Sequence, residues 1–390
     1  MKNAFLNGEL EEEVYMNLPP GFEEDKKKRM VCKLKKSLYG LKQSPCAWFD
    51  RFSKVIKSHG YSQGQTDKTL FVKHSLDGKI TILIVYVDDI ILTGDNFKEM
   101  EEIKRLMAME FEVKDLRTLK YFLGMEVARS KTGISISQRK YMLDLLEETG
   151  MLDCKPIKTP IEQGGKAKLI EGDTVDKGRY QQLVGKLIYL SHTRPDITFV
   201  VSVVSQYMHS SCQGHFDVVY RTLRYLKKTL GKGLFFGKEG NKKVEIFTDA
   251  DWAGSVNDRK STSEYCTRLW GNLVTWRSKK QSVVARSSAE AEYRVIAHGI
   301  CEAIWLKWLL EELQISCEFP MQLYCDNKAT ISIAHNPVHH DRTKYVEVDR
   351  HFITEKLENE IISIEYIPTD QQVADILTKG LSGPTFEYTQ

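Results

Sequence analysis

The chain has 390 residues, of which 42% are hydrophobic, 28% charged and 10% aromatic. This is the composition of a globular protein of two or three domains, and it excludes disordered, collagen-like and small disulfide-scaffold classes. Lysine and arginine total 56 against 53 acidic residues, a net charge of +3. A nucleic-acid partner is compatible with this near balance, because a basic groove can lie within a neutral total.

The first predicted elements are two helices and a hairpin. Residues 38–57 are predicted to form a turn and then a helix, and Gly150 closes a short amphipathic helix over 141–151. Between them, the β-branched runs at 71–72 and 80–92 flank Ser-Leu-Asp-Gly, which predicts a hairpin.

A change of composition follows. The polar segment 159–177 is the best candidate linker, 183–230 is helical in tendency, and the glycine-rich segment 231–241 predicts a second boundary. Strands and helices then alternate after an antiparallel start, which predicts a compact mixed α/β domain. Its expected elements are strands at 244–249, within 264–276, at 322–325 and at 361–367, and helices at 289–313, after 325 and from Asp370.

The pattern of cysteines and the hydropathy of the chain indicate the cellular compartment in which the protein works. Eight cysteines are scattered without a CxxC pair or a zinc-spaced histidine cluster, and no signal peptide is recognisable. We therefore expect reduced, mostly buried thiols of an intracellular protein. The longest apolar run, 80–92, is shorter than the ~20 residues of a membrane span and carries two carboxylates, so no membrane partner is expected.

Those two carboxylates, Asp88 and Asp89, lie at the centre of the apolar run. Paired carboxylates repel each other, and a divalent cation relieves the repulsion while it binds phosphate oxygens. The alternative is that the Asp-Asp pair merely forms the turn of a hairpin, where aspartate is favoured, and binds no metal ion. The aliphatic residues on both sides favour the metal-binding interpretation.

Six motifs identify a family. The chain resembles the reverse transcriptase and ribonuclease H region of copia-type LTR retrotransposon polyproteins over nearly its whole length. The matching segments are KNAFLNG at 2–8, SLYGLKQSP at 37–45, YVDD at 86–89, KYFLG at 120–124, TRPD at 193–196 and TDADWAG at 248–254.

The resemblance implies a multidomain α/β and α+β architecture. Residues 1–125 would form a truncated reverse transcriptase palm without fingers, and 126–240 the thumb and connection. Residues 241–381 would form a ribonuclease H-like domain with a mixed sheet, and 382–390 a tail.

The resemblance also implies roles around the palm. Asp88 and Asp89 would be polymerase metal ligands. The expected nucleotide- and primer-binding residues are Phe5 as the aromatic gate under the incoming sugar, Gly40 and Ser44 in the loop along template and nucleotide, and Phe122 and Gly124 in a primer-gripping turn. Core packing and turn chemistry are the alternative reading of these five residues. The family's first-strand Asp would precede Met1, so we expect little polymerase activity from this chain alone.

A second set of acids stands in the order strand, helix, strand, helix. Asp249 and Asp326 end strands, and Asp375 opens the last helix. Glu290 and Glu292 both border the apolar stripe that reaches Trp308 on the helix predicted at 289–313. Taken singly, each acid is a surface or capping residue. Ribonuclease H chemistry needs such acids around two metal ions ~3.5–4 Å apart. Periodicity does not choose between the two glutamates, whereas the resemblance favours Glu292.

Basic residues recur at two places. The helical set is Arg221, Arg224, Lys227 and Lys228, and the second strip contains Arg277 and Lys279. An ordinary solvated charged face is the alternative to phosphate binding for both. The resemblance favours contact with an RNA–DNA hybrid.

The sequence therefore predicts Mg²⁺- or Mn²⁺-dependent hydrolysis of RNA in RNA–DNA hybrids by a retrotransposon fragment. The expected partners are such a hybrid, an RNA template with its DNA primer, and other products of the polyprotein. The expected location is the cytoplasm, in a virus-like particle, or the nucleus. The alternative is a non-catalytic relic that at most binds nucleic acid.

Overall fold

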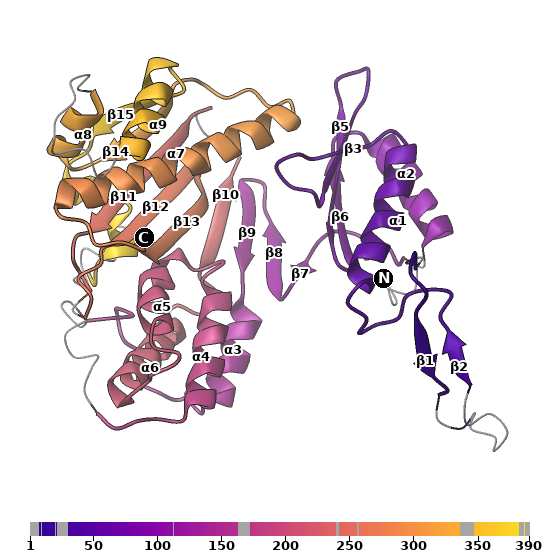
Figure 1. The fold of residues 1–390 in the computed structure, drawn as a ribbon, viewed down its shortest axis with the longest axis horizontal. Coiled ribbons are helices and arrows are strands. Elements are labelled where there is room, and N and C mark those ends of the chain that lie inside the picture. The colour runs from indigo at the N-terminus through magenta and orange to yellow at the C-terminus, as the bar shows by residue number, and fades with distance from the viewer. Residues whose placement is uncertain are drawn as a thin grey trace. The chain divides into compact units, whose positions relative to one another are not determined.

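The fold is described by a computed structural model (Figure 1). The described residues are 8, 10–19, 21, 30–111, 113–162, 172–238, 242–255, 257–335, 347–381 and 386. Phe5, part of the predicted linker and nearly all of the predicted tail lie outside them. The chain divides into two compact units, one made of Met1–Leu119 with Trp308–Ile315 and the other of Lys120–Lys307 with Ser316–Gln390.

The first unit is an antiparallel sheet covered by two helices. The sheet has the strand order β3-β4-β5-β6, and a separate short hairpin joins β1 to β2. The elements are β1 (Tyr15–Asn17), β2 (Val31–Lys33), α1 (Ser44–Ser58), β3 (Ser62–Gln63), β4 (Leu70–His74), β5 (Ile80–Tyr86), β6 (Asp89–Gly94) and α2 (Phe97–Glu110). Side chains of α1, α2 and one sheet face form a single core around Trp48, Phe52 and Phe71. The predicted helix and hairpins of this region are confirmed.

The second unit begins with a second antiparallel sheet, of strand order β10-β9-β8-β7, and a group of helices. Its elements are β7 (Tyr121–Phe122), β8 (Met125–Arg129), β9 (Gly133–Ser137), α3 (Arg139–Glu148), α4 (Lys177–Leu190), η4 (Pro195–Ile197), α5 (Thr198–Ser205), α6 (Gln213–Lys228) and β10 (Gly233–Gly237). The glycine-rich segment was expected to be a boundary, yet it contains β10, which pairs with β9 from Gly233↔Ser137 to Gly237↔Gly133.

A five-stranded mixed sheet follows. The strand order is β13-β12-β11-β14-β15, in which β11, β12 and β13 are antiparallel and β14 and β15 run parallel to β11. The elements are β11 (Val244–Asp251), β12 (Thr262–Leu269), β13 (Asn272–Lys280), α7 (Ser288–Glu312), β14 (Met321–Cys325), α8 (Lys328–His335), α9 (Glu347–Glu358), β15 (Ile362–Tyr366), η6 (Thr369–Gln371) and α10 (Asp375–Thr378). The predicted mixed α/β domain, with an antiparallel start and then alternating elements, is confirmed.

The mixed sheet is covered on both faces. Helix α7 packs closely on one face at Gly299, where a Cβ atom would lie 2.9 Å from Thr248 and 3.0 Å from Ile246. On the other face, Phe247 and Tyr324 join the core formed by α4, α5 and α6. Because strand residues alternate between the two faces, acids at the strand ends lie between these layers.

Three sequence expectations are wrong in detail. The last segment is not one helix from Asp370, because Gln372 is extended and separates η6 from α10. Trp308 does not continue the buried stripe of α7 and is 54% exposed. The cysteines are all free, as expected, but only Cys266 and Cys325 of the eight are buried.

Among the described residues, no helix is long and apolar enough to cross a bilayer.

Candidate active site

Two parallel strands place the first two acids of the site. The pairing of β11 with β14 runs from Glu245↔Gln322 to Phe247↔Tyr324 and then stops. Asp249 lies two residues beyond the last pair and is 3% exposed. Asp326 directly follows β14 and is partly exposed. Ligand sites of α/β proteins lie at such carboxyl ends of strands.

Helix α7 supplies the third acid. Glu292 is 4% exposed, and its Oε1 accepts a hydrogen bond of 3.0 Å from the backbone N–H of Ala250, next to Asp249. Glu290 turns elsewhere, since it accepts hydrogen bonds from the Arg286 backbone at 2.9 Å and the Arg294 side chain at 3.0 Å. The structure therefore brings Glu292, and not Glu290, to the acid group.

The fourth acid, Asp375, opens α10. Its Oδ1 lies 2.9 Å from Lys379 Nζ, and the same ammonium group lies 3.4 Å from Asp249 Oδ2. Gln372 is buried, and its side chain donates a hydrogen bond of 3.0 Å to the Thr248 carbonyl of β11. This contact fixes the start of α10 against the strand that carries Asp249.

Cys325 and Asp326 complete the group around Glu292. One carboxylate oxygen each of Glu292 and Asp326 and the Cys325 thiol lie within 4.8 Å of one another. The Thr369 hydroxyl donates a hydrogen bond of 2.7 Å to Asp326 Oδ2 and orients that carboxylate. We call Asp249, Glu292, Asp326 and Asp375 the acid cluster. All four predicted acids thus meet in one place.

Burial and mutual repulsion dominate the electrostatics of the acid cluster. Burial and the charge of Asp249 raise the pKa of Glu292 to about 9, with Asp326 adding to the shift. Burial and Asp249 likewise raise the pKa of Asp375 to about 7, against the opposing effect of Lys379. Burial also raises the pKa of the Cys325 thiol, and the charge of Glu292 adds to it. The cluster is therefore a strong attractor for positive charge.

The residues present fit a divalent metal ion. Glu292 Oε2 is buried and has no hydrogen-bond partner among the described residues, whereas the buried Asp249 Oδ2 has the Lys379 ammonium group 3.4 Å away. A buried carboxylate oxygen without a partner is costly unless a cation binds it. Carboxylate oxygens are the donors preferred by Mg²⁺ and Mn²⁺.

Sequence reasoning missed several neighbours of the acid cluster. Thr369, Gln372 and Cys325 contact it or hold its members, but no pattern in the chain singled them out. The contact of Lys379 could have been predicted from the sequence, because Lys379 follows Asp375 by four residues, which is the spacing of an ion pair on a helix. Glu264 is also buried, opposite Asp249 on β12, and accepts a hydrogen bond from Ser278 at 3.0 Å.

The first unit places Asp88 and Asp89 at the end of the β5–β6 hairpin. Tyr86 pairs with Asp89, and Val87 has φ +54° in the turn. The indole N–H of Trp48 donates a hydrogen bond of 2.8 Å to the Val87 carbonyl, so α1 fixes this turn. The two carboxylates are consequently held on a rigid hairpin and reach solvent, Asp88 more than Asp89.

Of the other described residues expected to contact nucleotide or primer, Gly40 lies in a turn, Ser44 begins α1, and Phe122 and Gly124 belong to the β7–β8 hairpin. Gly40 has φ +96°, which favours glycine. Ser44 is fully buried, and its hydroxyl donates to the Leu38 carbonyl at 2.6 Å, so it shapes the loop from within. Phe122 and Gly124 flank the β7–β8 turn, whose Leu123 carbonyl accepts a hydrogen bond from the Tyr189 hydroxyl.

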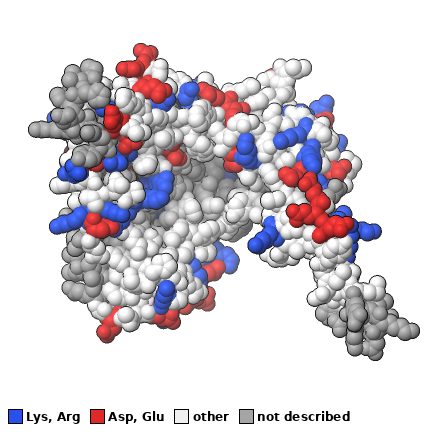
Figure 2. Space-filling view, in the orientation of Figure 1, with Lys and Arg blue, Asp and Glu red and all other residues white. Residues whose placement is uncertain are grey.

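The basic residues predicted to bind nucleic acid differ in how far their side chains are available to contact phosphate. Arg221 binds Glu162 at 2.8 Å, and Arg224 donates to the Lys155 carbonyl at 2.8 Å, so the two guanidinium groups hold the start of the predicted linker and the segment just before it. Lys227 is partly exposed and Lys228 exposed. Arg277 and Lys279 are exposed two residues apart on β13, so they share one face. Figure 2 shows Lys and Arg side chains gathered below α7, over this sheet.

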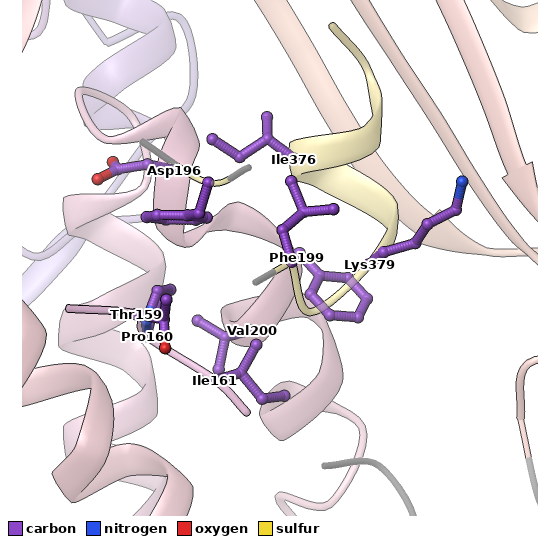
Figure 3. A pocket seen from close by; sticks show the side chains of 10 residues that line it. Thr159, Pro160, Ile161, Asp196, Phe199, Val200, Ile376 and Lys379 are labelled. Atoms are coloured by element: carbon purple, nitrogen blue, oxygen red, sulfur yellow. The ribbon is translucent and has the colours of Figure 1, made fainter. Parts of the chain in front are cut away.

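A small pocket lies beside the acid cluster and is distinct from it (Figure 3). It is bounded by Pro160, Ile161, Phe199, Val200 and Ile376. In Figure 3, the side chain of Lys379 extends away from these residues, and so does the carboxylate of Asp196. The pocket is therefore an apolar packing gap under α10.

Fold and site together define a mixed α/β protein with a buried acidic centre at the carboxyl ends of its strands. Residues 1–163 match the family model described as reverse transcriptase (RNA-dependent DNA polymerase). The Pol polyprotein of transposon RE1 from Arabidopsis thaliana is 41% identical over 99% of this chain and 26% of its own length. The Pol polyprotein of transposon TNT 1-94 from Nicotiana tabacum is 37% identical over 99% of this chain and 30% of its own length.

A yeast relative matches along nearly its full length. The putative transposon Ty5-1 protein of Saccharomyces cerevisiae is 31% identical over 77% of this chain and 98% of its own length. The chain belongs to the copia-type retrotransposon Pol polyprotein family and contains its reverse transcriptase domain. It spans between a quarter and a third of the length of the plant polyproteins.

Among solved structures, the N-terminal ribonuclease H domain of Rv2228c from Mycobacterium tuberculosis is 16% identical, with a TM-score of 0.27, over 38% of this chain and 95% of that chain. A foamy viral protease–reverse transcriptase in complex with double-stranded DNA is 12% identical, with a TM-score of 0.22, over 86% of this chain and 53% of that chain.

Proposed function

We propose that this chain hydrolyses the RNA strand of RNA–DNA hybrids with the help of Mg²⁺ or Mn²⁺. The observation that carries the proposal is the meeting of Asp249, Glu292, Asp326 and Asp375 at the open ends of β11 and β14. Acids from two strands and two helices are the arrangement that phosphodiester hydrolysis with two metal ions requires.

The four acids of the cluster would hold the cations. When bound, a divalent cation supplies a Lewis acid that polarises the phosphate and lowers the pKa of a water molecule. The partly exposed Asp326 faces solvent, whereas Asp249 and Glu292 are buried, so substrate would approach from the side of Asp326. Thr369 keeps Asp326 oriented for that approach through its 2.7 Å hydrogen bond.

Lys379 would act on the buried side of the acid cluster. Its ammonium group contacts Asp249 and Asp375 and partly neutralises them. Both carboxylates thereby stay close together before any cation binds. Gln372 has a positioning role, because its bond to the Thr248 carbonyl holds α10 in place.

The groups proposed to bind an RNA–DNA hybrid are basic side chains and one exposed aromatic ring. Exposed Arg277 and Lys279 would neutralise phosphates, and Lys227 and Lys228 would add charge from α6. Trp252, three residues after Asp249, is 49% exposed while its indole N–H donates to the Ala285 carbonyl at 3.1 Å. A fixed aromatic ring of this kind offers a stacking or sugar-packing surface.

Asp88 and Asp89 would form part of a separate polymerase metal site. Two-metal polymerisation needs a further carboxylate from another strand. The proposed ligands of the first unit are an RNA template and its DNA primer.

The test is cleavage of a labelled RNA–DNA hybrid by the purified chain in Mg²⁺. Asp326→Asn should lose at least about a hundredfold in rate, because it weakens metal binding at the substrate side. Asp370→Asn, an exposed acid in the adjacent η6, is the matched control and should stay within about twofold. Equal cleavage by Asp326→Asn and the unchanged chain would withdraw the assignment. Hybrid binding by the unchanged chain without cleavage would favour the non-catalytic alternative.

A further inference from the structure

A thiol lies inside the acid cluster, on the side of α7. Cys325 is the last residue of β14 and has no exposed surface. Its neighbour Tyr324 faces the opposite side of the sheet, where it stacks on Phe247 at 5.0 Å between ring centroids. The Cys325 sulfur thus lies on the α7 face, within 4.8 Å of carboxylate oxygens of Glu292 and Asp326.

A second observation points to a cation at this place. Glu292 Oε2 is buried without a hydrogen-bond partner among the described residues. The Cys325 sulfur accepts a long hydrogen bond of 3.4 Å from the Asn327 backbone N–H. One sulfur and two carboxylate oxygens, one of them from the partly exposed Asp326, therefore lie around a single point.

The donor set differs from what Mg²⁺ prefers. Mg²⁺ binds oxygen in octahedral geometry, whereas zinc-like cations accept sulfur, nitrogen and oxygen in a tetrahedron. A tetrahedral zinc ion, with bonds of ~2.3 Å to sulfur and ~2.0–2.2 Å to oxygen, sets its ligand atoms roughly 3.3–3.6 Å apart. The three ligand atoms here lie no more than 4.8 Å apart, so side-chain shifts of about 1 Å suffice.

We propose that Glu292, Cys325 and Asp326 form a binding site for a thiophilic divalent cation of the Zn²⁺ class. On binding, the cation replaces the proton of the Cys325 thiol and the proton that the Glu292 carboxyl carries, both protons pass to solvent, and no atom is oxidised or reduced. The site shares Glu292 and Asp326 with the proposed Mg²⁺ centre, so the two cations exclude each other. Zn²⁺ is then an inhibitor of the chain.

Binding of the cation does not depend on the proposed hydrolysis, whereas inhibition rests on it. Binding is measured by calorimetric titration of the full chain with Zn²⁺ and by the ultraviolet sulfur-to-metal charge-transfer band that Cd²⁺ produces. Cys325→Ala should weaken Zn²⁺ binding at least about tenfold and reduce the Cd²⁺ band, because one of three ligands is lost. The matched control is Cys266→Ala, a buried thiol on β12 that is not part of this group of ligands. It should leave both measurements unchanged.

A competition experiment needs no variant and so does not depend on how Cys325→Ala folds. Excess Mg²⁺ should raise the apparent dissociation constant of Zn²⁺ in the unchanged chain. The proposal would be overturned if excess Mg²⁺ left the Zn²⁺ binding isotherm of the unchanged chain as it was. It would also be overturned if Cys325→Ala, with a native circular dichroism spectrum, gave a Cd²⁺ band as strong as that of the unchanged chain. In hybrid cleavage, micromolar Zn²⁺ should inhibit the unchanged chain more than Cys325→Ala. A chain that binds Zn²⁺ as described but never cleaves would refute the proposed function alone.

Discussion

At the scale of single residues, Lys379 decides whether Asp249 and Asp375 can be buried side by side. Carboxylates at short range repel each other more strongly in a protein interior than in water. The ammonium group of Lys379 lies 2.9 Å from one and 3.4 Å from the other, and it offsets part of that repulsion. The acid cluster therefore carries an internal counter-ion of its own.

Lys379→Met should consequently destabilise the metal-free chain. We expect a loss of about 1–2 kcal/mol, discounted from the cost of breaking a fully buried pair because the Lys379 side chain is 42% exposed. Mg²⁺ should recover more stability in this variant than in the unchanged chain, since the cation replaces the lost charge. Urea unfolding in EDTA and in Mg²⁺ measures both effects. Lys140→Met, which removes a more exposed ion pair with Asp144 on α3, is the control and should change little.

The two glutamates at the start of α7 allow a matched comparison. Glu292→Gln should lower hybrid cleavage at least about a hundredfold, because it removes a charge that would bind metal. Glu290→Gln should cleave within about threefold of the unchanged chain, since Glu290 contacts Arg286 and Arg294 instead. Initial rates at saturating Mg²⁺ distinguish them. A larger loss in Glu290→Gln would contradict the geometry.

The sequence could identify the four acids but not all of their partners. Asp249, Asp326 and Asp375 stood out because each ends a strand or opens a helix. Periodicity could not separate Glu290 from Glu292, since both border the apolar stripe. The family resemblance favoured Glu292, and the hydrogen bond from Ala250 to Glu292 places it in the acid cluster. Contacts such as Thr369 with Asp326 join segments distant in the chain, and no local pattern announces them.

At the scale of elements, a buried ion pair holds the helical part of the second unit together. Arg194 and Asp196 are 1% and 4% exposed, and their side chains form two hydrogen bonds of 2.6 and 2.8 Å. The Tyr225 hydroxyl of α6 donates to the same Asp196 carboxylate, and the Thr229 hydroxyl accepts from Arg194 at 2.7 Å. The TRPD motif is therefore a packing device that joins η4 to α6.

Asp196→Asn should cost about 3–5 kcal/mol of unfolding free energy, because it leaves the Arg194 charge buried without its partner. Burial alone would raise the pKa of Asp196, but Arg194 outweighs it and holds the pKa below its usual range. The stabilisation is thus present above about pH 4 and is lost as the pH falls below that value. Denaturant unfolding between pH 3 and 7 should show this acid loss in the unchanged chain and less of it in the variant.

Local sequence patterns predicted secondary structure and burial less well where tertiary contacts decide them. Gly233 and Gly237 indicated a break, yet the segment pairs along all five residues of β9. The stripe of α7 predicted burial of Trp308, but the buried positions there are Ala303, Leu306 and Leu310. Long, strongly patterned strands such as β5 and β11 were predictable because burial dictates their composition.

At the scale of the whole molecule, each of the two units has its own apolar core. Phe52 lies at the centre of the first core and Leu187 in that of the second, and neither has exposed surface. The four-part division at residues 125, 240 and 381 stays a prediction. Separate cores are the condition for separate cooperative unfolding.

Calorimetry of the full chain should therefore resolve two unfolding transitions. Phe52→Ala should lower only one of them, with a loss of about 3–5 kcal/mol, and Leu187→Ala only the other, with a loss of about 2–5 kcal/mol. Mg²⁺ should raise the transition that Leu187→Ala lowers, since the acid cluster belongs to the second unit. A single transition shifted by both variants would show that the units unfold together.

The early end of pairing between β11 and β14 has a consequence for ion size. Beyond Phe247 and Tyr324, each strand keeps its outer neighbour but no longer bonds to the other. The peptide groups that carry Asp249 and Asp326 are thus free to spread or approach by fractions of an ångström without breaking a ladder. Under the proposed function, these small shifts would let the same four side chains adjust to the slightly different radii of magnesium and manganese.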